Sequence, residues 1–501
     1  MKSAADYADR HLRTFERPPV PSPDAIDDVY LIGICGTGMG ALAGLFRQAG
    51  YDVRGTDEAA YPPMSTHLAA QDIPVLEGYD PAHLDPPPDL TVVGNACRPT
   101  HPEAAAARER GLVQQSFPEA LGHFFLGADR QSVVVAGTHG KTTTTGLLVH
   151  TLHHAGVDAG FLVGGVMQNT GRSYHLGTDA PFVVEGDEYD SAYFDKRPKF
   201  MHYRPTTALV SSVEFDHADI YADGADYRRA FETFVGTVEA DGLLALCADA
   251  PDVRALAAHT DAPVRTYGLA DGADVRATGV RHAPDGYSFT LVVNGTAQTD
   301  VHLPLHGRYN LQNALGVALL ALHHGLSPAQ VADGLATFEG MKRRQEVRGE
   351  PGGVLVLDDF AHHPTAVDAT IRAVRAAHPD RRLVAVFEPR SNSSRRKIFE
   401  GPYGRAFDAA DRALLKAPPV RHNDEADAML DPQAVVQTIA DRGTPAATYA
   451  DVDRLLAALV DTLRPNDVAL LMSNGSFDGL PDRLLDALDD ARQTGNKAIA
   501  G

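Results

Sequence analysis

Short apolar runs rich in β-branched residues alternate with Ala/Leu-rich helical stretches along most of the chain, and glycine-containing turns separate them. Three such runs are Val29–Ile32, Ser132–Ala136 and Val354–Leu357. This alternation is typical of parallel α/β sheets, whose strands are covered on both faces. Because it recurs in three blocks, we predict an α/β protein of three domains, which agrees with a length of 501 residues at about 150 residues per domain.

The blocks divide the chain near residues 125–131 and 340–350. We expect an N-terminal extension (1–27) and domains over 28–127, 128–341 and 342–501. Tyr287–Val293 alternates and leads into Asn294-Gly295, which predicts a type I′ turn and a hairpin attached to the central sheet. Further expected elements are helices over Ala41–Ala49 and Thr143–His154, a strand ending at Asp57, and strands containing Leu90–Val93, Phe182–Glu185, Ala208–Val210, Leu383–Phe387 and Val468–Met472.

Charge and composition exclude several classes of protein. The formal net charge of −21 disfavours a nucleic-acid or membrane-surface role, because a phosphate polyanion would be repelled. The chain shows no apolar run of the roughly 18–20 residues that a membrane span needs, and the first 27 residues lack the apolar core of a secretory signal. Three scattered cysteines favour a reducing compartment, so we expect a cytoplasmic protein.

A phosphate-binding loop is predicted where Gly140-Lys141-Thr142 separates an apolar strand from a helical stretch. Backbone N–H groups of such a loop approach phosphate oxygens, and the helix N-terminus favours negative charge. Lys141 can neutralise phosphate charge and the Thr142 hydroxyl can bind Mg²⁺. The nearest preceding glycine is Gly137, so the loop is shorter than the common form.

Acidic residues follow two later strands of the same block. Glu185 ends an apolar run, where a metal ligand is expected beside a phosphate loop. Glu214-Phe215-Asp216-His217 follows the next strand, and its histidine is either a metal ligand or a hydrogen-bonded loop residue.

A glycine-rich turn, Gly36-Thr37-Gly38-Met39-Gly40, lies between a strand and a helix, and Asp57 follows about twenty residues later. The pattern predicts a diphosphate site. A role for the glycines in packing alone is the alternative.

These motifs, taken with three others, resemble the Mur ligases, the ATP-dependent amide-forming enzymes of peptidoglycan assembly. The others are Glu185-Gly186-Asp187-Glu188, Gly307-Arg308-Tyr309-Asn310-Leu311-Gln312-Asn313 and Asp358-Asp359-Phe360-Ala361-His362-His363-Pro364-Thr365. The resemblance covers about residues 30–488. It implies a Rossmann-like N-terminal domain, a central domain like the P-loop ATPases with a small β-hairpin part, and a Rossmann-like C-terminal domain that binds the incoming peptide or amino acid.

The resemblance also implies ATP and Mg²⁺ as cofactors, together with a set of site residues. His362 and His363 either orient the incoming amine or only form hydrogen bonds within their loop. Asn310 is either an adenine contact or a helix N-cap. The Arg390 guanidinium suits a peptide carboxylate. The implied residues are Lys141, His217, Arg344 and Asp359 for catalysis; Gly137, Thr138, His139, Gly140, Lys141, Thr142, Thr143, Asn310 and Asn313 for the nucleotide; Thr142, Glu185 and His217 for the metal; and Gly36, Thr37, Gly38, Met39, Gly40, Asp57, His362 and Arg390 for the substrates.

Within the family, the chain resembles the branch that acts on UDP-N-acetylmuramate. The segments that favour the tripeptide L-alanyl-γ-D-glutamyl-meso-diaminopimelate as acceptor are Tyr61–Thr66, Gly94–Ala96, Asp195–Arg197, Glu388–Asn392 and Met472–Gly475. L-Alanine is the alternative acceptor. Two other hypotheses stay open: a dinucleotide-dependent dehydrogenase and a non-catalytic nucleotide sensor. We expect a monomer or a weak homo-oligomer, with no nucleic-acid or membrane partner.

Overall fold

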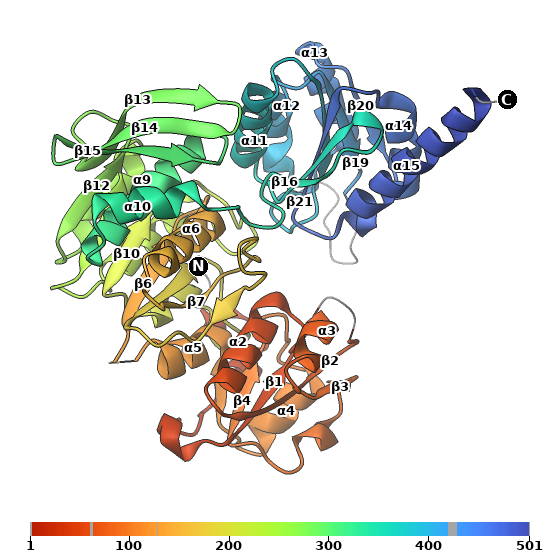
Figure 1. The fold of residues 1–501 in the computed structure, drawn as a ribbon. Helices are drawn as coiled ribbons and strands as arrows, with labels where there is room; N and C mark the ends of the chain where they lie inside the picture. The colour runs from red at the N-terminus through yellow and green to blue at the C-terminus, as the bar shows by residue number, and fades with distance from the viewer. Residues whose placement is uncertain (1–2, 61–63, 128, 419–427, 500–501) are drawn as a thin grey trace.

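The computed structural model describes residues 3–60, 64–127, 129–418 and 428–499. Figure 1 shows three lobes in chain order, each built around one sheet. This arrangement confirms the predicted α/β class with three domains. The expected boundary at residue 128 and the segment Tyr61–Pro63 lie outside the described residues.

The N-terminal lobe contains a five-stranded, wholly parallel sheet in the order β3-β2-β1-β4-β5. Three short turns of helix precede it: η1 (Ala4–Asp6), α1 (Arg10–Arg13) and η2 (Pro23–Ala25). Its strands are β1 (Asp28–Ile32), β2 (Asp52–Asp57), β3 (Val75–Glu77), β4 (Leu90–Val93) and β5 (Gln114–Ser116). Its helices are α2 (Thr37–Gln48), α3 (Met64–Ala69), η3 (Pro81–Leu84), α4 (Pro102–Glu109) and α5 (Phe117–Phe125).

Helix α2 begins four residues before the expected Ala41, so the prediction of its start was wrong. Gly36 is the N-cap, and Gly38 and Gly40 lie inside the helix rather than in a turn before it. A Cβ at Gly40 would lie 2.3 Å from the Met64 sulfur. A larger residue here would therefore displace the Met64 side chain.

The central lobe contains a ten-stranded sheet in the order β15-β14-β13-β12-β11-β10-β6-β9-β7-β8. Its strands are β6 (Gln131–Ala136), β7 (Gly160–Leu162), β8 (Tyr174–His175), β9 (Pro181–Gly186), β10 (Thr207–Val210), β11 (Leu243–Cys247), β12 (Val264–Gly268), β13 (Val275–Ala283), β14 (Gly286–Val293) and β15 (Thr296–Leu303). Its helices are α6 (Lys141–His154), η4 (Lys199–His202), α7 (Gly224–Val235), α8 (Pro251–Ala255), η5 (Leu256–His259), α9 (Arg308–His323) and α10 (Pro328–Ala336). Helices α6, α9 and α10 pack against one another (Figure 1).

The predicted hairpin is confirmed. Strands β14 and β15 pair antiparallel, and Asn294 and Gly295 both have positive φ, as a type I′ turn requires. Strand β13, which the sequence did not indicate, pairs antiparallel with β14 and parallel with β12. The hairpin is therefore part of a three-stranded extension of the main sheet.

The C-terminal lobe contains a six-stranded sheet in the order β16-β17-β21-β18-β19-β20, parallel except for β16. Its strands are β16 (Glu346–Gly349), β17 (Leu355–Asp359), β18 (Arg382–Glu388), β19 (Arg412–Lys416), β20 (Ala446–Tyr449) and β21 (Asp467–Ser473). Its helices are η6 (Pro351–Gly353), α11 (Pro364–Ala377), η7 (Lys397–Phe399), α12 (Glu400–Ala406), α13 (Pro432–Asp441), α14 (Val452–Thr462), η9 (Phe477–Gly479) and α15 (Leu480–Ile499).

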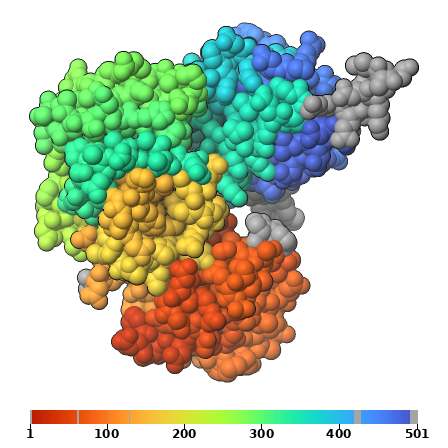
Figure 2. Space-filling view, in the orientation of Figure 1, coloured from red at the N-terminus to blue at the C-terminus, as the bar shows by residue number. Residues whose placement is uncertain are grey.

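The buried apolar side chains join the first two lobes but not the third. One continuous cluster runs from Ile26 in the N-terminal lobe to Met341 at the end of the central lobe. The C-terminal lobe has two clusters of its own. Figure 2 shows the lobes from outside, with the N-terminal lobe in red and orange. Among the described residues, no helix combines the length and the apolar character that a membrane span needs.

Candidate active site

The phosphate loop connects β6 to α6, and the helix begins at Lys141, two residues earlier than predicted. Gly137 and Gly140 both have positive φ. A Cβ at Gly137 would lie 2.2 Å from Ser211 Oγ, and one at Gly140 would lie 2.7 Å from Asn313 Oδ1. Both conformation and space therefore require glycine at these two positions.

The segment after β10 holds this loop in place. The Ser211 hydroxyl donates to the His139 carbonyl at 2.6 Å, and the His139 N–H donates to Ser212 Oγ at 2.9 Å. Thr138 Oγ1 donates to the Glu214 carbonyl at 3.0 Å. No local pattern indicates Ser211 and Ser212, because their role depends on β10 lying beside β6.

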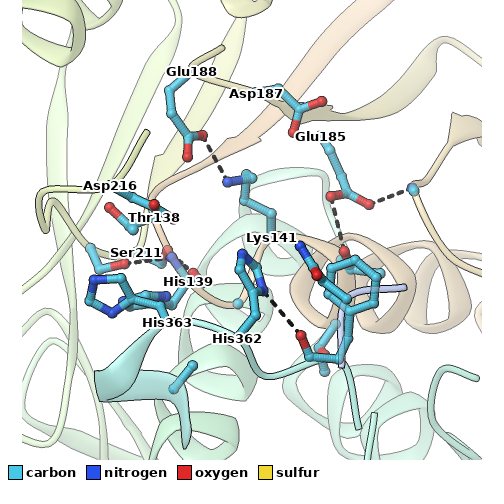
Figure 3. Close-up of a pocket in the computed structure, with 18 of the residues that line it drawn as sticks. Thr138, His139, Lys141, Glu185, Asp187, Glu188, Ser211, Asp216, His362 and His363 are labelled. Atoms are coloured by element: carbon cyan, nitrogen blue, oxygen red, sulfur yellow. Dashed lines mark hydrogen bonds and ion pairs between the residues drawn. The ribbon is translucent and has the colours of Figure 1, made fainter. Parts of the chain in front are cut away.

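Lys141 lies over its own loop (Figure 3). Its Nζ donates to the Gly137 carbonyl at 2.7 Å and to Glu188 Oε2 at 2.8 Å. Burial opposes the charged form of Glu188, but Lys141 and His217 outweigh it and lower the pKa of that carboxyl to about 2. The sequence indicates Glu188 only within the Glu185-Gly186-Asp187-Glu188 motif and not as a site residue, yet it is the carboxylate that pairs with the loop lysine.

Thr142 and Glu185 form an oxygen-rich corner beside Lys141. Thr142 Oγ1 donates to Glu185 Oε2 at 3.0 Å, and the Gly164 N–H donates to the other carboxylate oxygen at 2.5 Å. Burial and the nearby Asp187 raise the pKa of Glu185. A divalent cation would relieve this unfavourable burial of charge, and hydroxyl and carboxylate oxygens are ligands that Mg²⁺ prefers. The donor set therefore fits the expected metal.

His217 pairs with Glu188, with 3.3 Å between Nε2 and Oε1. Burial would lower the pKa of His217, but Glu188 and Asp216 raise it to about 9. Its neighbour Asp216 is buried and accepts a hydrogen bond from the Ser393 hydroxyl of the C-terminal lobe at 2.5 Å.

Asn310 and Asn313 lie side by side in the first turns of α9, where the Asn313 amide donates to Asn310 Oδ1 at 3.2 Å. The N-cap of this helix is Gly307, so the alternative reading of Asn310 as an N-cap is wrong. Asn310 instead donates to the His306 carbonyl at 2.8 Å. Both asparagines line the same cavity as Lys141.

The C-terminal lobe contributes side chains from two segments. Arg344 donates to Thr142 Oγ1 at 3.1 Å, and Asp359 accepts hydrogen bonds from the Gln345 and Ala361 N–H groups. Burial lowers the pKa of His362 to about 4. His363 accepts the Thr365 N–H as the N-cap of α11, at 3.3 Å, which gives it the structural role that the sequence left open.

One cavity of about 1060 Å³ joins these groups. Its lining includes Thr37, Gly38 and Asn95 of the N-terminal lobe, the phosphate loop, and Ser391 and Asn474 of the C-terminal lobe. Six predicted site residues do not line it: Gly36, Met39, Gly40, Asp57, Gly137 and Arg390.

Two of these six have other contacts. Asp57 accepts the Cys35 N–H at 2.8 Å and thereby supports the glycine-rich segment. Arg390 lies 3.5 Å from Asp478 and 3.8 Å from Glu388. Their roles in substrate binding stay predictions.

Comparison with known proteins assigns the family. Three family models match in order: the Mur ligase family catalytic domain over residues 28–128, the Mur ligase middle domain over 135–321 and the Mur ligase glutamate ligase domain over 343–475. The chain belongs to the Mur ligase family.

Individual Mur ligases are similar over almost their whole length. The UDP-N-acetylmuramate–L-alanyl-γ-D-glutamyl-meso-2,6-diaminoheptandioate ligase of Escherichia coli is 38% identical, over 92% of this chain and 98% of its own. The UDP-N-acetylmuramate–L-alanine ligase of Kineococcus radiotolerans is also 38% identical, over 88% and 96%. The crystal structure of a murein peptide ligase from Psychrobacter arcticus matches with a TM-score of 0.72 and 35% identity, over 92% and 99%.

Proposed function

We propose that this chain is an ADP-forming ligase that joins L-alanyl-γ-D-glutamyl-meso-diaminopimelate to UDP-N-acetylmuramate. The observation that carries the proposal is the single cavity that all three lobes line around Lys141. A reaction of a nucleotide, a sugar nucleotide and a peptide needs three binding regions that meet at one point. The similarity to the Escherichia coli and Psychrobacter arcticus enzymes supports the tripeptide as acceptor.

ATP would activate the muramyl carboxylate as an acyl phosphate, which the amine of the incoming alanyl residue then attacks. The first step brings two anions together, so positive charge at the γ-phosphate is the main requirement. Lys141 and Arg344 supply it from opposite sides of the seam between the central and C-terminal lobes. Mg²⁺, when bound by Thr142 and Glu185, would supply further charge compensation at the phosphates.

Other residues of the cavity position the reactants. Asn310 and Asn313 would offer amide groups to the adenine edge, and Gly38, in the first turn of α2, would lie beside a bound diphosphate. The acyl phosphate would hydrolyse if water reached it. Closure of the C-terminal lobe over the phosphate loop would exclude that water.

An acceptor panel tests the proposal. Purified protein is given ATP, Mg²⁺ and UDP-N-acetylmuramate with either the tripeptide or L-alanine, and ADP release and the muramyl product are measured. We expect tripeptide-dependent ADP release. The equal identity to the Kineococcus radiotolerans enzyme favours L-alanine as the second candidate, and ADP release with L-alanine alone would select it. No product with either acceptor contradicts both.

The remaining expectations belong to the same proposal. We propose a cytoplasmic enzyme that acts in peptidoglycan recycling as a monomer or a weak homo-oligomer. Sedimentation of the purified chain with and without substrates tests the oligomeric state.

A further inference from the structure

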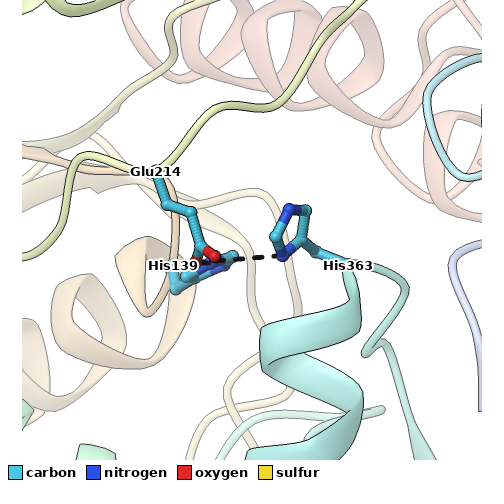
Figure 4. Close-up of side chains that lie close together, drawn as sticks. All are labelled: His139, Glu214 and His363. Carbon is cyan, nitrogen blue, oxygen red and sulfur yellow. Dashed lines mark hydrogen bonds and ion pairs between the residues drawn. The ribbon is translucent and has the colours of Figure 1, made fainter. Parts of the chain in front are cut away.

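Two histidines and one glutamate meet across the seam between the central and C-terminal lobes (Figure 4). His139 belongs to the phosphate loop, Glu214 to the segment after β10, and His363 to the N-terminus of α11. One ligand atom from each lies within 4.8 Å of the other two. This group is separate from the Thr142–Glu185 corner, and the proposed reaction does not use it as a unit.

The donor chemistry and distances suit a transition metal. Two imidazoles and one carboxylate form a donor set that binds Zn²⁺ with an open fourth position. His139 Nε2 lies 2.8 Å from Glu214 Oε2, and His363 Nδ1 lies 3.9 Å from the same oxygen. Ligands around a tetrahedral zinc ion are separated by roughly 3.3–3.6 Å, from bond lengths of about 2.0–2.2 Å. The two distances lie on either side of this range.

The protonation states also suit a metal. His363 Nδ1 accepts a long hydrogen bond from the Thr365 N–H, at 3.3 Å, so this nitrogen is unprotonated, and a metal would take its lone pair in place of that hydrogen bond. Burial lowers the pKa of His363, which favours the neutral ligand form. Burial opposes ionisation of Glu214, but hydrogen bonds from His139 and Thr365 outweigh it and lower the pKa to about 2. A metal at His139 Nε2 would take the place of the hydrogen bond between this atom and Glu214.

Outer contacts fix the carboxylate. The Thr365 hydroxyl donates to Glu214 Oε1 at 2.5 Å, so the second oxygen is held toward the imidazoles. The described residues contain one other group with metal-ligand spacing, formed by Glu119, Asp195 and His202. Its carboxylates differ from Glu214 because they are already paired with arginines. Arg17 and Arg197 already pair with its carboxylates, at 2.8 and 2.7 Å. No guanidinium pair is recorded for Glu214 in the described part of the chain, so positive charge there has to come from imidazolium or a metal.

We propose that His139, Glu214 and His363 bind a divalent transition metal ion of the zinc class, which links the central lobe to the C-terminal lobe. The ion would hold the outer side of the phosphate loop against α11. It is distinct from the Mg²⁺ that the reaction requires, and the proposal does not depend on which acceptor the enzyme uses.

Zinc titration calorimetry of the full chain tests this proposal, in a large excess of Mg²⁺ and without nucleotide. Three proteins are compared: wild type, His363→Asn and His175→Asn. Asparagine is a favourable N-cap, so the first variant keeps the start of α11 while it removes the imidazole. His175 pairs with Asp158 at 2.7 Å in the same way as His139 with Glu214, and is the matched control.

We expect one Zn²⁺ site in wild type and in His175→Asn, and at least about tenfold weaker binding in His363→Asn. Co²⁺ should give the intense visible absorption of a four-coordinate ion in wild type. The same absorption should be much weaker in His363→Asn. Hydrogen exchange around residues 211–217 and 362–366 should slow with Zn²⁺ in wild type. Equal zinc affinity in all three proteins, or no zinc binding by wild type, would overturn the proposal. Because no readout uses catalysis, failure here is distinguishable from failure of the proposed function.

Discussion

The two seams between the lobes differ in chemistry: apolar side chains form the first, and polar side chains form the second. At the first, α5 packs on η4, and Phe125 and Phe182 lie with ring centroids 6.4 Å apart within one continuous apolar cluster. At the second, polar groups meet: Arg344 with Thr142, Thr365 with Glu214, and Ser393 with Asp216. The seam that has to bind phosphates and exclude water is the polar one.

This difference assigns different roles to the two seams: the apolar one contributes mainly to stability, and the polar one to the reaction. Burial of apolar surface is not directional and favours one fixed packing of the first two lobes. Hydrogen bonds and ion pairs each contribute little net free energy, because water can replace them. The C-terminal lobe can therefore open and close at low cost, while the N-terminal lobe stays attached to the central one.

The largest effect is expected at the apolar seam. Phe125→Ala should lower the free energy of unfolding by about 3–5 kcal/mol, because it leaves a cavity beside Phe182. Urea denaturation followed by circular dichroism measures this. Ile398→Ala is the control, since that side chain is 56% exposed and should change stability by less than about 0.5 kcal/mol. A comparable change in both variants would mean that the seam is not tightly packed.

At the polar seam we expect an effect of nearly the same free energy, but on the rate of the reaction rather than on stability. Lys141→Ala should slow ADP release about 100-fold or more, or roughly 3–4 kcal/mol in the activation barrier, because a charge-stabilising group is lost. The exposed Lys397→Ala is the matched control and should retain wild-type rates. If Lys141→Ala keeps its activity, a nucleotide-sensing role becomes the better account.

A smaller effect is expected where one hydrogen bond crosses the polar seam. Ser393→Ala removes the donor to Asp216 and should lower kcat/KM by up to about fivefold, or about 1 kcal/mol. The urea midpoint should hardly move, because this seam contributes little to stability. A large fall in the midpoint with normal kcat/KM would reverse the assignment of roles to the two seams.

The smallest effect concerns the rim of the apolar seam. Burial opposes ionisation of Asp195, but His202 and Arg197 outweigh it and hold the pKa of that carboxyl well below its usual range. A lowered pKa stabilises the fold above the ordinary carboxyl pKa, and this stability is lost as pH falls. Between about pH 5 and pH 3, wild type should lose stability more steeply than Asp195→Asn, by about 1 kcal/mol or less. Parallel unfolding curves for the two proteins would argue against this contribution.

Local patterns were sufficient for most of the framework. The apolar run Leu90–Val93 is β4 without change, and Asn294-Gly295 gave the turn of the hairpin. Helix starts were missed at α2 because glycine has a low helix propensity, and packing overrides it: Gly38 lies against Phe117, and Gly40 against Met64. Propensity cannot report a neighbour that comes from a distant part of the chain.

The site was predictable only as separate segments. Motifs identified Lys141 and Glu185, because each belongs to a recognisable stretch of sequence, whereas Arg344 was implied only by the resemblance to the Mur ligases. The partner of Lys141 depends on how β9 and α7 meet, since Tyr227 and His217 both converge on Glu188. The Ser393–Asp216 and Thr365–Glu214 bonds join residues over 150 positions apart, so no local pattern indicates them.

The pairing of Lys141 with Glu188 has a consequence for nucleotide affinity. The lysine already has a buried internal counter-ion, so an incoming phosphate exchanges one anion for another rather than neutralising a bare charge. Net affinity then reflects the difference between two strong attractions. Such an exchange allows the product nucleotide to leave, because the carboxylate can take the ammonium group back.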